Sequence, residues 1–167
     1  MPITKSASVT EKNKTNTAAT EVLRKFRQVF NAVKNHFQQL EKKVGIGGAQ
    51  VWALSLMHEH PGIGVNDLSN LMDIHQSTAS NIVKSLVTSE LIEVRKNIED
   101  KRIVELHINT AGKRILKKAP APFSGVLPHA LLQLNPKVLG RLNDDLSDLL
   151  ELLEADESAA KTPLANL

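Results

Sequence analysis

The sequence contains no cysteine and no tyrosine, and its aromatic residues are limited to four Phe and one Trp. Without a thiol, the chain can form no disulfide, no thiolate metal site and no cysteine nucleophile. It also lacks a Gly-rich phosphate loop, a Gly-x-Ser-x-Gly nucleophile turn and a His-Glu-x-x-His zinc helix. We therefore predict that the protein is not an enzyme and that it needs no cofactor.

Long apolar runs are missing as well. No stretch approaches the roughly 20 residues that a membrane helix needs, and no apolar signal segment follows Met1. We expect a cytoplasmic protein without a membrane partner. His58 and His60 lie two residues apart, and residues at that spacing do not share a helix face. Pro61 follows His60 directly and marks the end of the helix. No metal site is expected there.

The charge of the chain is unevenly distributed. The net charge is +3, and residues 1–43 hold nine Lys or Arg against three acidic residues. Residues 61–110 hold five Lys or Arg against seven acidic residues, which is a net charge of −2. The overall surplus favours an anionic partner, but the middle of the chain must rely on where its few cations lie.

The spacing of apolar residues predicts a long helix near each end of the chain. Each carries an apolar stripe in which spacings of three and four residues alternate. The first stripe consists of Val22, Phe26, Val29, Val33, Phe37, Leu40 and Val44, and the second of Leu139, Leu142, Leu146, Leu149 and Leu153. The two helices can bury each other within a monomer or pair with a second copy of the chain, and readers of DNA with two-fold symmetry place their recognition helices roughly 34 Å apart. We therefore predict a homodimer.

Between these helices, the sequence predicts helices at 49–60, 65–72 and 76–89, followed by strands at 91–94 and 103–108. This order is a helix-turn-helix followed by a β-hairpin wing. The predicted fold class is mainly α, with a winged helix-turn-helix lobe and a helical dimerisation domain. A helix presented in this way fits the major groove of DNA, about 12 Å wide, and a basic hairpin beside it can reach the backbone or the minor groove.

The boundaries of the remaining elements follow from proline and capping residues. Asn109 and Thr110 are candidates to cap a helix that runs to about Lys118, after which Pro120 and Pro122 interrupt it, and a loop should continue through Pro128. Asn135, followed by proline, should start the last helix. We expect a disordered tail at 1–19 and one domain at 20–156, followed by a flexible tail at 157–167. Within the domain, 20–48 and 119–156 form the dimerisation helices and 49–118 the DNA-binding lobe.

The predicted helix at 76–89 has one apolar and one polar face. Its apolar stripe is Ala79, Ile82, Val83 and Leu86, which leaves small polar side chains on the outside. The candidate DNA-binding residues are Gln76, Ser77, Thr78, Ser80, Asn81 and Lys84 on this helix and Arg95, Lys96, Lys101 and Arg102 in the wing. The plain alternative is a solvated helix face and a hairpin held by surface ion pairs to its own acidic residues.

Several of these segments resemble the MarR family of winged-helix transcriptional regulators. The resemblance runs from Gly47 to Leu153 and is carried by the reading unit at 67–86, by Glu90-Leu91-Ile92-Glu93-Val94-Arg95, by Asp100-Lys101-Arg102 and by Gly112 after the wing. It implies a homodimer whose DNA-binding lobes extend from a helical dimer domain, and repression of a promoter until a ligand or chemical stress releases it. It also implies that Asp100 orients Arg102 toward the minor groove.

The resemblance further implies a crevice for a small-molecule effector between the dimer helices and the DNA-binding lobe. We expect Phe26, Phe30, His36 and Trp52 to line it. The predicted partners are thus double-stranded DNA, a second copy of the chain and a small-molecule effector. The alternative is a winged-helix module that binds protein without specific DNA binding, which the net charge of −2 over 61–110 favours.

Overall fold

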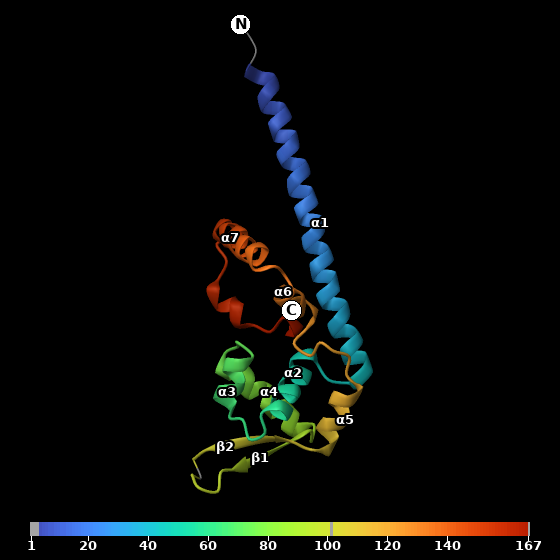
Figure 1. The fold of residues 1–167 in the computed structure, drawn as a ribbon, viewed down its shortest axis with the longest axis vertical. Helices are drawn as coiled ribbons and strands as arrows, with labels where there is room; N and C mark the ends of the chain where they lie inside the picture. Colours follow the sequence, from blue (N-terminus) through green and yellow to red (C-terminus); the bar gives the residue numbers. More distant parts are fainter. Residues whose placement is uncertain (1–3, 101, 167) are drawn as a thin grey trace.

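The computed structural model describes residues 4–100 and 102–166, with the backbone alone for 4–13. The elements are α1 (Thr4–Val44), α2 (Gly48–Glu59), α3 (Val65–Leu71), α4 (Gln76–Thr88), β1 (Ile92–Lys96), β2 (Val104–Ile108), α5 (Thr110–Lys118), α6 (Val126–Leu132) and α7 (Pro136–Leu152), followed by the short 3-10 helices η1 (Glu157–Lys161) and η2 (Leu164–Asn166). Figure 1 shows α1 as a long rod, with a lobe made of α2 to α5 and the hairpin at its far end.

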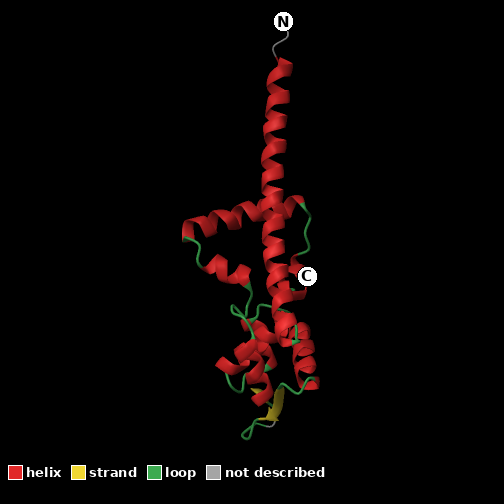
Figure 2. Ribbon diagram, turned by 90° about the vertical axis from the view of Figure 1, so that its right-hand side faces the viewer, coloured by secondary structure: helices red, strands yellow, loops and turns green. Residues whose placement is uncertain are grey.

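The main core lies within this lobe. Leu54 of α2, Leu68 of α3, Leu86 of α4 and Leu106 of β2 are fully buried and belong to one apolar cluster. Full burial of a side chain of this size contributes about 1.5–3 kcal/mol. The hairpin is the one sheet among the residues described, and it lies at the end of the molecule opposite the first turns of α1 (Figure 2). The predicted mainly helical fold with a two-stranded wing is confirmed.

Helix α1 begins earlier than the sequence prediction allowed. The disordered tail expected at 1–19 differs from the structure, in which the helix already includes Thr4. The segment 4–44 contains neither Gly nor Pro, so a helix nucleated farther along can propagate through it with one further hydrogen bond per residue. Gly45, with φ +78°, ends the helix. Within the described segments, no helix, α1 included, is both long and apolar enough to span a lipid bilayer.

The segment after α5 folds more than its prolines suggested. The loop expected to run through Pro128 is wrong, because α6 already starts at Val126 and proline is tolerated in the first turn of a helix. Both predicted caps are confirmed. The Asn109 side chain accepts a hydrogen bond from the Gly112 amide, and the Asn135 side chain accepts one from the Lys137 amide.

The C-terminal tail, residues 155–166, returns to the lobe after α7 (Figure 1). The sequence prediction of a flexible tail at 157–167 differs from this arrangement. Pro163 is buried, Leu164 and Ala165 are half-buried, and η2 packs against α1 and α2. By contrast, no residue of α7 is buried.

Gly112 marks the tightest contact between α5 and the hairpin. A Cβ atom at this position would collide with the Leu91 carbonyl oxygen and lie 2.7 Å from Ile108 Cγ1. Because a backbone atom is involved, the clash cannot be relieved by a change of side-chain rotamer.

We expect Gly112→Ala to lower the free energy of unfolding by about 1–3 kcal/mol, because it forces α5 away from the hairpin. Denaturant unfolding followed by circular dichroism measures this change. The matched control is Gly140→Ala in α7, where an added Cβ meets nothing within 4 Å. That control should leave stability unchanged or raise it by about 0.5–1 kcal/mol. Equal effects of the two substitutions would contradict the close packing at Gly112.

Candidate nucleic-acid interface

Packing decides which face of α4 is presented to solvent. Ala79, Ile82, Val83 and Leu86 are buried in the core, as their spacing predicts. Gln76, Ser77, Asn81 and Lys84 are exposed, whereas Thr78 and Ser80 are half-buried. The structure therefore exposes four of the six predicted residues of this helix and leaves the other two half-buried at the border of the core.

A polar contact that the sequence analysis missed fixes α4 against α2. The Gln50 side-chain amide donates a hydrogen bond to Ser85 Oγ, and its oxygen accepts one from the Gly47 amide. Gln50 thus ties the start of α2 to the middle of α4. The position of Gln50 in the first turn of α2 did not predict this contact, because Ser85 lies 35 residues away in the chain.

The N-terminus of α4 lacks a side-chain cap. His75 occupies the N-cap position and its side chain makes no capping hydrogen bond. Instead, His75 Nε2 lies 3.3 Å from the Ser158 carbonyl oxygen in the C-terminal tail. The first amides of this helix therefore keep their capacity to donate hydrogen bonds to an anion.

The wing is a regular antiparallel hairpin, with Ile92 opposite Ile108 and Lys96 opposite Val104. An isolated bridge between Ile63 and Leu106 joins it to the loop between α2 and α3. Since Leu106 is fully buried, the base of the hairpin is fixed to the core while its tip projects from the lobe.

Asn97 organises the wing tip, which the sequence analysis did not anticipate. Its side-chain oxygen accepts hydrogen bonds from the amides of Glu99 and Asp100, at 2.8 and 2.9 Å, and its side-chain nitrogen donates one to Glu105. This bond to Asn97 and the contact with His107, 3.1 Å away, lower the pKa of the Glu105 carboxyl from its ordinary value.

Asp100 and Arg102 form the contact that the sequence predicts. Asp100 accepts hydrogen bonds from the amide, Nε and Nη2 of Arg102, at 3.0, 3.1 and 3.3 Å. These bonds hold the pKa of the Asp100 carboxyl below its ordinary value. The Arg102 side chain nevertheless remains 92% exposed, so its outer surface is open to a further anionic partner.

The other predicted cations of the wing differ in their surroundings. Arg95 Nη2 lies 2.6 Å from Glu93 Oε2 on the same face of β1, so part of its charge is already compensated. Lys96 is exposed. Lys101 lies outside the residues that the structure describes.

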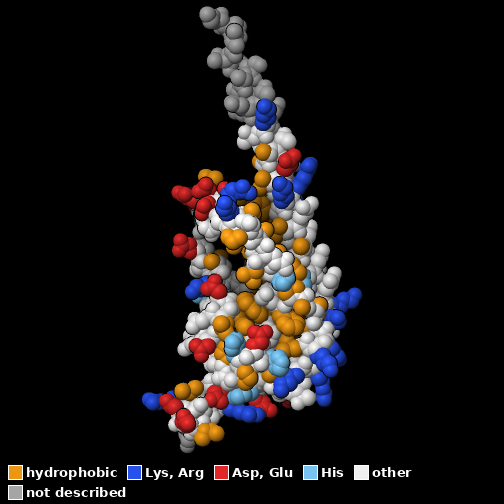
Figure 3. All heavy atoms as spheres, in the orientation of Figure 1, with side chains coloured by type: hydrophobic (Ala, Val, Ile, Leu, Met, Phe, Trp, Pro, Cys, Tyr) orange, Lys and Arg blue, Asp and Glu red, His pale blue; other side chains and the backbone are white. Residues whose placement is uncertain are grey.

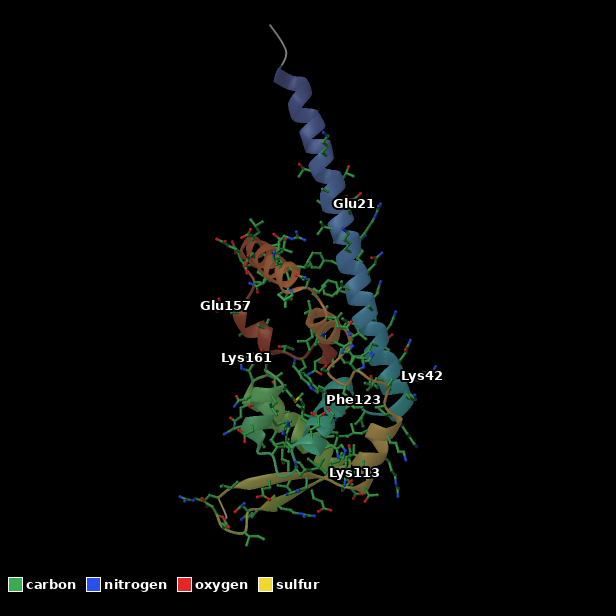
Figure 4. All side chains as sticks on the ribbon, viewed as in Figure 1. Glu21, Lys42, Lys113, Phe123, Glu157 and Lys161 are labelled. Carbon is green, nitrogen blue, oxygen red and sulfur yellow. The ribbon has the colours of Figure 1, made fainter. Side chains whose placement is uncertain are left out.

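Further positive charge lies on the flank of the lobe. Lys113, Arg114, Lys117 and Lys118 of α5 are exposed, as are Lys42 and Lys43 at the end of α1. Figure 3 shows Lys and Arg side chains along this α1–α5 edge, and Figure 4 labels Lys42 and Lys113 on it. Six exposed cations thus lie beside the helix-turn-helix rather than within it.

The four residues predicted to line an effector crevice do not line one common cavity. Trp52 lines a cavity of about 140 Å³ between the lobe and α1, and Phe30 lines a second hollow along α1. Phe26 stacks with Phe30, with 6.2 Å between ring centroids. His36 Nε2 lies 3.1 Å from the Pro122 carbonyl oxygen. In the described part of the chain, no three His, Cys, Asp or Glu side chains are grouped so that they could hold a metal ion.

A packed helix-turn-helix with an open polar face, joined to a hairpin with a charged tip, is a winged helix-turn-helix domain. A sequence model of the MarR family matches residues 44–103. This segment of the chain is thus similar to the MarR family of helix-turn-helix transcriptional regulators.

Individual proteins with similar sequences carry the same kind of name. The Bacillus subtilis HTH-type transcriptional regulator YsmB is 22% identical over 98 residues, which are 59% of this chain and 67% of that protein. A second one, YpoP, is 24% identical over 91 residues, which are 54% of this chain and 64% of that protein. Among solved structures, that of the S. aureus MepR–DNA complex has a TM-score of 0.55 at 21% identity and covers 77% of this chain and 93% of that chain. This last likeness shows the shared fold.

We expect the Asp100 carboxyl to titrate below the ordinary range of aspartate. Because its pKa in the folded state is lowered, the contact with Arg102 is complete above about pH 3.9 and is lost only as the pH falls through the lowered value. NMR of the side-chain carboxyl measures this titration. Arg102→Ala should return the pKa toward its ordinary value, whereas Lys96→Ala should leave it unchanged. If the pKa of the Asp100 carboxyl is the same in Arg102→Ala as in the unsubstituted protein, the contact is contradicted.

Proposed function

We propose that the protein is a sequence-specific DNA-binding transcriptional regulator, that it acts as a homodimeric repressor on a pseudo-palindromic operator, and that a small-molecule effector releases it. The observation that carries this proposal is the pairing of an open polar face on α4 with a wing whose Arg102 is held by Asp100 and remains exposed. MepR, which shares this fold, was solved as a DNA complex, and that agrees with the proposal.

The residues of α4 suit different parts of DNA. Ser77 and Thr78 lie in the first turn, next to the uncapped amides, and are suited to phosphate oxygens. Asn81 and Lys84 lie farther along the exposed face. An Asn side chain can pair with both hydrogen-bonding groups of adenine in the major groove, and a Lys can donate to guanine or to a phosphate.

The attraction to DNA must come largely from cations outside the acidic middle of the chain. Residues 61–110 carry a net charge of −2, and the pairing of Glu93 and Asp100 with arginines leaves that sum unchanged, because each pair joins one cation to one acidic residue. The exposed cations of the α5 flank add attraction at longer range, since about 8 Å of screening length applies at physiological salt. Charge placement therefore permits an anionic partner despite the local acidic surplus.

The proposed dimer follows from apolar surface that this chain leaves uncovered. Val22, Leu23 and Phe30 of α1 are 48–61% exposed, and Leu150 and Leu152 of α7 are 51% and 84% exposed. Exposed apolar surface of this kind on two neighbouring elements marks an interaction site. A second copy of the chain covers it and sets the distance between two recognition helices.

A winged-helix module that binds protein is the second candidate, because the acidic surplus in the middle of the chain favours it. Salt dependence distinguishes the two, since binding through Z phosphates gives a log–log slope of about −0.9Z.

The proposed function is tested by selecting a random double-stranded DNA library on the purified protein at about 0.15 M salt, a physiological value. We expect an inverted repeat whose half-sites lie about one helical turn apart. Asn81→Ala should weaken binding by about 1–3 kcal/mol and relax the preference at one position of each half-site. Recovery of no sequence above background would favour the protein-binding module.

Arg102→Ala refines the same test. Because its side chain is 92% exposed, the substitution should not unfold the wing. We expect the salt slope to become shallower by about one for each protomer if Arg102 meets a single phosphate. The matched control is Lys137→Ala at the start of α7, which removes the same charge far from the wing and should leave the slope unchanged.

We expect Leu150→Glu combined with Leu152→Glu to abolish dimerisation and to weaken operator binding strongly. Both side chains are mostly exposed in the isolated chain, so the substitutions should cost little stability within it. Sedimentation over a range of protein concentrations measures the assembly. Asn143→Glu with Ser147→Glu adds the same charge to the same helix at polar positions and serves as the control. A dimer that survives the Leu150→Glu and Leu152→Glu substitutions would show that these two side chains lie outside the interface.

A further inference from the structure

The C-terminal tail lies in the crevice between α1 and the lobe. Pro163 is buried, and Thr162, Leu164 and Ala165 line the same cavity as Phe37 of α1 and Trp52 of α2. Ala165 also packs against the main apolar core. Figure 4 places the labelled Phe123 between α1 and the lobe, and this side chain closes another wall of the cavity. The tail is thus surrounded by three separate parts of the chain.

With the tail in place, the cavity beside Trp52 is small, whereas the hollow along α1 has a volume of about 400 Å³. The cavity beside Trp52 has a volume of about 140 Å³. Pockets that hold drug-sized ligands have volumes of about 300–1,000 Å³. On its other side, the tail borders the hollow along α1. Both this hollow and the cavity beside Trp52 are lined by Phe37, Leu164 and Ala165. Segment 162–166 therefore acts as a partition, and its withdrawal would join the two spaces.

The segment has the properties of a bound peptide. Thr162 is extended, with φ −94° and ψ 126°, and Pro163 restricts the chain before it docks, which reduces the entropy lost on binding. Upstream, the Ser158 carbonyl oxygen lies 3.3 Å from Nε2 of His75, the N-cap residue of α4. The tail thus connects α1 to the first turn of the recognition helix.

We propose that this crevice is a binding site for a short apolar peptide, that its occupant is the chain's own segment 162–166, and that an apolar effector must displace this segment to enter. The displacement step rests on the proposed release by an effector; the docking of the tail does not. Displacement removes the connection to His75 and joins the two hollows, so effector entry and lobe position become coupled.

Trp52 is the only tryptophan of the chain and reports on the tail directly. We compare the full-length protein with Leu164→Asp, which places a charge in the crevice, and with Asn166→Asp, which adds the same charge at an exposed position of the same short helix. We expect Leu164→Asp alone to increase acrylamide quenching of Trp52 and to speed tryptic cleavage after Lys161. An excess of a peptide spanning residues 156–167 should reverse the increase in quenching.

The displacement step is measured with anilinonaphthalene sulfonate as an apolar probe, in the absence of DNA. If the tail is docked for about 90% of the time, releasing it should tighten probe binding about tenfold. Quenching and cleavage of Leu164→Asp equal to those of Asn166→Asp would overturn the docking, and unchanged probe affinity would overturn the displacement. Should Leu164→Asp lose helical circular dichroism, Leu164→Ser provides the same comparison. A failed operator selection would leave all these readouts interpretable.

Discussion

Four apolar side chains of α4 lie in the core against α2, α3 and the hairpin, and this packing decides what the helix presents to a partner. Turning α4 so as to bury Asn81 or Lys84 would expose Ile82 and Leu86 and leave a buried polar group without a partner. The Gln50–Ser85 hydrogen bond fixes the same orientation at the start of α2. The recognition face is therefore a consequence of the core, and the lobe can present it without a bound partner.

The wing follows a different principle, because its tip lies outside the core. Side-chain hydrogen bonds take the place of apolar contacts there: Asn97 holds the backbone of the turn, and Asp100 holds Arg102. Exposed ion pairs of this kind contribute little to stability. Their effect is to reduce the number of conformations open to Arg102, so that less entropy is lost when it meets an anion.

The long helices and the tail link this lobe to the rest of the chain. Among the side chains of α1 that the structure describes, only Val33 and Leu40 are buried, and α7 buries no residue, so both helices leave apolar surface exposed. The C-terminal tail meanwhile fills the crevice at the junction of α1 and the lobe. The proposed dimer assembly and the proposed entry of an effector would both act at this junction. A change there would alter the distance between the two DNA-binding lobes of a dimer.

Periodicity in the sequence determined α4 and its two faces, the hairpin and the caps at Asn109 and Asn135, because each depends on residues close together in the chain. The resemblance to the MarR family implied the contact between Asp100 and Arg102, which are two residues apart. Only the tertiary structure decided the role of Gln50, the helical start at Val126 and the return of the tail to Trp52. These features depend on partners distant in the chain or on packing that offsets an unfavourable local preference, and local patterns carry no information about such contacts.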